Sequence, residues 1–109
     1  MKTAYDKLVR DGIAARLEEA GVGYETRRAE RDEMKELLIR KLHEEVEELG
    51  AATLASEVSE EIADILEVLY AIAARNGYTE QDLAERRTTK RNERGAFNDG
   101  VVLLWTESR

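Results

Sequence analysis

The stretch that decides the fold runs from Leu42 to Leu69, LHEEVEELGAATLASEVSEEIADILEVL. It holds two pairs of carboxylates, Glu45-x-x-Glu48 and Glu61-x-x-Asp64, and each pair interrupts a helical pattern of apolar residues. Acidic residues three positions apart are common on exposed helices. Two such pairs inside apolar patterns, separated by a short link, are a more specific signal.

The first pair belongs to a helix expected over residues 32–49. On a wheel of about 100° per residue, Glu45 and Glu48 fall within the arc filled by Leu37, Leu38, Leu42, Val46 and Leu49. Glu44 falls at the border of this arc, and Glu47 lies outside it. His43 lies on the opposite side, where a solvated polar group costs little.

The second pair repeats the arrangement on a helix expected to end near Asn76. Glu61 falls on its core line, Asp64 flanks that line, and the apolar members are Val58, Ile62, Ile65, Leu69 and Ile72. Two helices joined by so short a link lie antiparallel, so both acidic pairs should face one cavity. A carboxylate in an apolar face is costly unless it is paired or binds a metal, and four carboxylates cannot pair with one another. A hard divalent cation would resolve the conflict.

Other metal sites fit the sequence less well. The run from His43 to Glu47 lacks the second histidine of a zincin, and a di-iron bundle needs Glu-x-x-His on two helices, whereas the chain has one histidine. Ligation by carboxylate oxygens alone favours Mg²⁺, with Mn²⁺ as an alternative. A purely structural network of buried charges stays open.

Composition limits the classes of partner. The chain has 109 residues, a net charge of −7 and no cysteine or proline. It should form a single domain over residues 1–109, without disulfides or thiolate zinc sites. The negative charge disfavours a nucleic-acid polymer. No apolar run has the length of a membrane span, and the N-terminus lacks a signal-peptide core, so the expected compartment is the cytoplasm.

The fold class expected is mainly all-α, an antiparallel core of three to four helices. A short helix through Ile13 should stop at Gly21. Asp32 is a candidate N-cap and Gly50 a candidate stop for the first long helix, and Thr53 or Ser56 could cap the next. Thr79 should cap a last helix that Gly95 ends. Residues 24–29 and 101–105 could pair as two short strands.

Magnesium on carboxylates commonly completes its shell with substrate phosphates and water, which indicates phosphate chemistry. The chain has no P-loop, so phosphates would be bound by metal, lysine and arginine. It offers no evident covalent nucleophile, which leaves a metal-activated water. Glu44, beside Glu45, is a candidate to accept the proton, although it could equally be a solvated helix residue. Lys7 and Arg10, three positions apart, could likewise be either a solvated helix start or a basic arm that reaches a phosphate.

Four blocks of sequence then show a resemblance: the block from Tyr5 to Asp11, the block from Lys41 to Leu49, the block from Glu60 to Val68, and Lys90-x-x-x-Arg94-Gly-Ala-Phe97. In order and spacing they resemble the all-α nucleoside triphosphate pyrophosphohydrolase superfamily, which includes the MazG-like and phosphoribosyl-ATP pyrophosphohydrolase-like proteins. The resemblance covers nearly the whole chain.

The resemblance implies a helical homodimer or higher oligomer that cleaves a nucleotide between the α and β phosphates, with Mg²⁺, and releases pyrophosphate. It implies Glu45, Glu48, Glu61 and Asp64 as metal ligands, the same four that the wheel selects. It implies that Lys90 and Arg94 contact phosphate, and Lys7, Arg10 and Asp11 match its N-terminal block. From the residue pattern and the resemblance together, the candidate catalytic residues are Glu44 and Glu45, and the candidate substrate-binding residues are Lys90, Arg94, Lys7, Arg10 and Lys41.

Two departures from the family pattern occur. The family's Asp-Lys-Ile-Pro is Asp11-Gly12-Ile13-Ala14 here, and its Arg-Gly-Gly-Phe is Arg94-Gly95-Ala96-Phe97. The missing lysine weakens the case for a substrate-binding N-terminal arm. Two other functions stay open: a nucleotide- or metal-binding module without turnover, and a helical oligomer whose acidic stripes meet basic residues of a partner subunit.

Overall fold

Four helices form in the computed structural model, which describes residues 1–109. They are α1 (Ile13–Glu19), α2 (Met34–Ala51), α3 (Ala55–Arg75) and α4 (Glu80–Arg94). The chain contains no strand, which confirms the all-α class. The expected pairing of residues 24–29 with 101–105 is not formed, and Tyr24 and Trp105 are both exposed. No helix combines the length and the apolarity that a membrane span requires.

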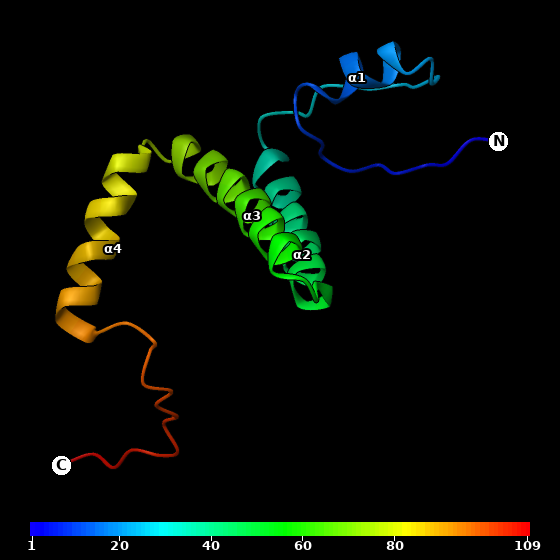
Figure 1. The fold of residues 1–109 in the computed structure, drawn as a ribbon. Coiled ribbons are helices and arrows are strands. Elements are labelled where there is room, and N and C mark those ends of the chain that lie inside the picture. Colours follow the sequence, from blue (N-terminus) through cyan, green and yellow to red (C-terminus); the bar gives the residue numbers. More distant parts are fainter.

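The centre of the fold is the pair α2 and α3, which lie side by side in Figure 1 and are joined by three residues, 52–54. So short a link makes the two helices antiparallel, as the sequence predicted. Their contact buries the four apolar side chains Leu37, Leu38, Val68 and Ala73. The one buried charged residue is Glu45, at 5% exposure.

The helix ends follow local signals in three places. Thr79 and Asp82 form a capping box at the start of α4, in which the Thr79 side chain accepts from the Asp82 N–H and the Asp82 carboxylate accepts from the Thr79 N–H. After α3, Gly77 adopts a φ of 81°, and Tyr78 N–H donates to the Ala73 carbonyl. This is a Schellman ending, which needs a left-handed residue. Gly95, with φ 85°, ends α4.

Three predicted signals at the ends of α2 and α3 are wrong. Helix α2 is preceded by Glu33 rather than capped by Asp32, and the Glu33 carboxylate instead accepts from the Glu30 N–H. Gly50 does not stop α2, because its φ is not positive and the helix continues to Ala51. Leu54 precedes α3 without a side-chain cap, so neither Thr53 nor Ser56 has that role.

The chain is elongated. Its radius of gyration is 18.5 Å, whereas a compact chain of this length would have about 13 Å. Among the helices α4 contacts only α3, and α1 contacts none. Figure 1 shows α4 and the C-terminal segment leading away from the central pair. Few residues are therefore buried within one copy.

Large apolar side chains remain exposed along most of the chain, from Tyr5 to Trp105. Val46 of α2, expected on the apolar face of that helix, is 50% exposed. Ile62 and Leu69 of α3, expected in the core, are 45% and 39% exposed. Beyond α4, Phe97 and every residue of 101–105 are exposed, including Trp105 at 75%. One copy of the chain has more apolar surface than its own packing covers.

Candidate metal centre

Three carboxylates from the two central helices converge. Glu45 of α2 and Glu61 and Asp64 of α3 each offer an oxygen, and these atoms lie within 4.8 Å of one another. The antiparallel pairing brings them together, because Glu45 lies on the face of α2 that packs against α3. Glu61 and Asp64 lie one turn apart on α3 and are half-buried.

Two oxygens of this group lack partners. Glu45 Oε2 and Glu61 Oε2 are buried and accept no hydrogen bond. A buried carboxylate oxygen without a donor is costly, and native structures usually satisfy such atoms. The donor set is all oxygen and carries negative charge, which is the ligand chemistry of hard divalent cations. Glu45, Glu61 and Asp64 therefore fit a cation of the Mg²⁺ or Mn²⁺ type.

Glu48, the fourth predicted ligand, lies outside this group of three and is exposed. It is nevertheless a neighbour of Glu61. Desolvation, together with the nearby carboxyl groups of Glu45 and Glu48, raises the pKa of Glu61 to about 7. Bringing several carboxylates together favours the protonated form of one of them.

Two basic residues, Arg10 and Lys41, contact the acidic group. Arg10 Nη2 donates to Asp64 Oδ1 at 2.6 Å, across 54 positions of sequence. Lys41 Nζ lies 3.3 Å from Glu45 Oε1 and 3.5 Å from Glu44 Oε1. Glu61 is the one member of the converging group without an ion-pair partner. Lys41 was predicted to bind substrate, and in this structure it binds the acidic group itself.

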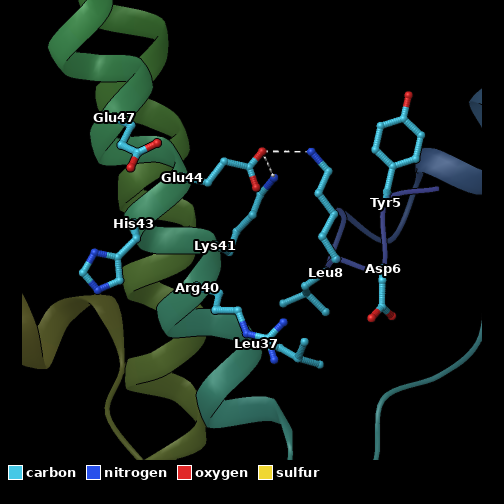
Figure 2. Close-up of a pocket in the computed structure, with 10 residues that line it drawn as sticks. Tyr5, Asp6, Leu8, Leu37, Arg40, Lys41, His43, Glu44 and Glu47 are labelled. Carbon is cyan, nitrogen blue, oxygen red and sulfur yellow. Dashed lines mark hydrogen bonds and ion pairs between the residues drawn. The ribbon is translucent and has the colours of Figure 1, made fainter. Parts of the chain in front are cut away.

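Glu44 belongs to a neighbouring cleft that the N-terminal segment forms with α2. Lys7 Nζ donates to Glu44 Oε1 at 2.9 Å. Figure 2 shows Glu44 and Lys41 on the side of α2 that faces this segment, whereas His43, which also lines the cleft, points away from both. The hydrogen bond from Lys7, with the charge of Lys41, lowers the pKa of Glu44 and, reciprocally, Glu44 raises the pKa of Lys7.

The lowered pKa bears on the predicted role of Glu44. A carboxylate held by two ammonium groups stays ionised and is a weaker base than a free one. Geometry also separates it from the group of three, which contains Glu45 but not Glu44. Within one copy, the structure gives Glu44 the role of anchoring Lys7.

Lys90 and Arg94 lie away from the acidic group. They line a second cleft with Tyr78 and Arg86, and none of the four predicted ligands lines it. The guanidinium of Arg86 lies 5.5 Å from the ring centre of Tyr78, a cation–π arrangement. One copy therefore does not bring the predicted phosphate-binding residues beside the predicted metal ligands.

The ion pairs of the site were missed by sequence reasoning. The pairing of Lys41 with Glu44 and Glu45 follows three- and four-residue helical spacing and could have been inferred from the sequence. The pairings of Arg10 with Asp64 and of Lys7 with Glu44 have no such signal, because they join distant segments. Comparison of the chain with protein-family models, curated proteins and solved structures finds no match.

Proposed function

We propose that this chain is a Mg²⁺-dependent nucleoside triphosphate pyrophosphohydrolase, which cleaves between the α and β phosphates to give a nucleoside monophosphate and pyrophosphate. The observation that supports the proposal most is the convergence of Glu45, Glu61 and Asp64 with two buried, unpaired oxygens. The order of sequence blocks that resembles the pyrophosphohydrolase superfamily supplies the reaction.

Glu45, Glu61 and Asp64 would hold the cation, with Glu48 as the more exposed fourth ligand. A bound divalent cation neutralises phosphate charge and lowers the pKa of water, which is the chemistry that this reaction needs. The protein side chains contribute position and charge. The carboxylates are fixed on two packed helices, which is the kind of rigid support that a reaction site requires.

Lys90 and Arg94 would bind the departing pyrophosphate, since charge builds on that group as the bond breaks. They lie four positions apart on α4 and are exposed. Because they lie away from the acidic group within one copy, we include a homodimer or higher homo-oligomer in the proposal. In such an assembly, a neighbouring copy could complete the site.

The test is a pyrophosphate-release screen of the purified protein over a panel of canonical and noncanonical nucleoside triphosphates, with Mg²⁺ or Mn²⁺. The expected products are a monophosphate and pyrophosphate, and a Glu45→Gln variant should release neither. Orthophosphate with a diphosphate would place attack at the γ phosphate and contradict the proposal. Nucleotide binding without any release would favour the alternative, a binding module without turnover.

A further inference from the structure

The N-terminal segment is held against the central helix pair by its charged side chains. Arg10 donates to Asp64 and Lys7 donates to Glu44, at 2.6 and 2.9 Å. Helix α1, which follows directly, contacts no other helix. We call residues 5–11 the N-terminal arm. The attachment of this arm therefore depends on two ion pairs, with Leu8 beside Leu37 in the same cleft.

One of these ion pairs involves the candidate metal centre. Asp64 offers an oxygen to the group that also contains Glu45 and Glu61, and the same carboxylate accepts the hydrogen bond from Arg10. The guanidinium is thus the nearest permanent positive charge to Asp64. It supplies part of the charge compensation that clustered carboxylates need.

A guanidinium and a divalent cation on one carboxylate repel each other. Both positive charges would meet at the Asp64 carboxylate, which is half-buried, whereas the Arg10 side chain is 55% exposed, so solvent screens only part of their repulsion. A cation held by three carboxylates also withdraws the negative charge that keeps Arg10 in place. Arg10 and the cation should therefore compete for the site.

We propose that Arg10 is a tethered counter-ion of the acidic site, and that binding of a divalent cation displaces it and loosens the N-terminal arm. This inference rests on the cation site of the proposed function. With the cation bound, Arg10 is free to meet an anionic ligand such as a phosphate, and Lys7 alone attaches the arm by charge. Occupancy of the metal site then controls the position of the chain's N-terminal positive charges.

The opposite arrangement makes a different prediction. If Arg10 orients Asp64 for the cation, as a supporting residue does in many metal sites, its removal would weaken cation binding. If Arg10 is a competitor, its removal strengthens cation binding, because the ion pair between Arg10 and Asp64 no longer has to break before the cation binds. Whether the loss of Arg10 strengthens or weakens cation binding therefore distinguishes a competing role from a supporting one.

The first measurement is calorimetric titration of Mg²⁺ into the full chain without nucleotide. Arg10→Gln should bind Mg²⁺ about threefold more tightly or better, since the arm no longer competes. The matched control is Arg16→Gln, which removes the same charge from an exposed arginine of α1 that forms no ion pair, and it should bind like the unmodified chain. Unchanged or weaker binding by Arg10→Gln would overturn the proposal.

The second measurement follows the arm itself. Because the chain has no cysteine, Thr3→Cys and Ser59→Cys can carry two spin labels, and labelled protein diluted into unlabelled protein reports the distance within one copy. Without cation the distance distribution should be narrow. Saturating Mg²⁺ should broaden it, and Asp64→Asn should broaden it without Mg²⁺. A distribution that neither change alters would contradict displacement.

The two proposals fail in different ways. Cation binding that leaves the arm in place overturns the displacement and leaves the pyrophosphohydrolase proposal standing. If neither the unmodified chain nor Arg10→Gln binds a divalent cation, the metal centre and the displacement are both wrong. Displacement of the arm without any release of pyrophosphate retains this inference and overturns only the enzymatic activity.

Discussion

Glu45 on α2 and Glu61 on α3 approach each other between the two central helices, and each keeps one buried oxygen, Oε2, without a hydrogen-bond partner. This relationship makes the helix contact electrostatically unfavourable when both groups are ionised. It also makes the contact responsive to protons and cations. Either one reduces the repulsion between the two helices.

The first prediction concerns stability against pH in the presence of a chelator. The folded-state pKa of Glu61 is about 7, above its ordinary value of 4.5. The folded state therefore binds this proton more strongly than the unfolded chain does. The resulting stabilisation is full below about pH 4.5 and is lost as the pH rises through 7.

Glu61→Gln should remove this pH-dependent loss of stability. At pH values above 7 the variant should have a higher melting temperature than the unmodified chain, because a neutral amide replaces the ionised carboxylate. Thermal unfolding followed by circular dichroism between pH 5 and 8.5 measures the effect. The control is Glu60→Gln, an exposed residue on the same helix. If both variants keep the pH dependence of the unmodified chain, Glu61 is not the group responsible.

The second prediction ranks the metal ligands. Glu45→Gln and Glu61→Gln should each weaken Mg²⁺ binding by about tenfold or more, since each removes a charged ligand from a buried group. Glu48→Gln should have a smaller effect, because Glu48 is exposed and lies outside the converging group. Calorimetry gives the affinities.

Two controls belong with this ranking. Glu47→Gln removes a charge from an exposed position on α2, and His43→Ala changes a side chain that points away from Glu44 and Lys41 (Figure 2). Both should leave Mg²⁺ affinity nearly unchanged. A large loss in His43→Ala would place the cation on a different face of α2.

A third prediction separates substrate binding from metal binding. Lys90→Ala and Arg94→Ala should depress nucleotide turnover by roughly tenfold to a hundredfold, because each removes a charge that would stabilise the leaving pyrophosphate. Neither should change Mg²⁺ affinity without nucleotide. Arg87→Ala, an exposed arginine of α4 outside the cleft that holds Lys90 and Arg94, is the control. Equal losses of turnover in all three variants would indicate that the positive charge of α4 as a whole, rather than these two residues, affects turnover.

The fourth prediction concerns the N-terminus of α4. Thr79→Ala should destabilise α4 by about 1 kcal/mol, because it leaves the Asp82 N–H without its acceptor. Because α4 contacts only α3 among the helices, the loss should appear as reduced helical signal rather than as unfolding of the central pair. Thr79→Ser keeps the hydroxyl and should restore the signal. Equal helicity in all three proteins would exclude the capping box as a source of stability.

The fifth prediction is self-association. Exposed Ile62 and Leu69, with the exposed apolar C-terminal segment, leave more apolar surface than a stable monomer usually carries. Sedimentation at low micromolar concentration should show at least a dimer. Ile62→Lys should shift the distribution toward monomer, and Ala63→Lys, which adds the same charge at the next exposed position, should do so less. A folded monomer of the unmodified chain would contradict this prediction.

Periodicity predicted the central helix pair and the burial of Glu45 well, because a strong apolar repeat and a short link leave few alternatives. It misplaced Val46 of α2, which was expected on the apolar face and is 50% exposed, and it predicted the buried face of α3 less well. Ile62 and Leu69 were expected inside and are exposed, whereas Val68 and Ala73 are buried. Helix α3 is apolar on more than one face, so its sequence alone does not determine which face meets α2.

Contacts between distant segments could not be predicted from the sequence. The bond between Arg10 and Asp64 depends on where the N-terminal arm lies against the helix pair, which no spacing rule describes. The expected strand pairing had a suitable apolar pattern, but its two segments do not meet within one copy. Helix ends were predictable where a glycine or a capping threonine was needed, as at Gly77 and Thr79.

The position of the single tryptophan decides how unfolding can be observed. Trp105 lies in the exposed C-terminal segment rather than between the helices. Its fluorescence in a single copy should therefore resemble that of an indole in water and should change little when α2 and α3 separate. A shift of its emission to shorter wavelength would instead report that the segment has been covered, so the protein carries an intrinsic optical probe of association but not of its own core.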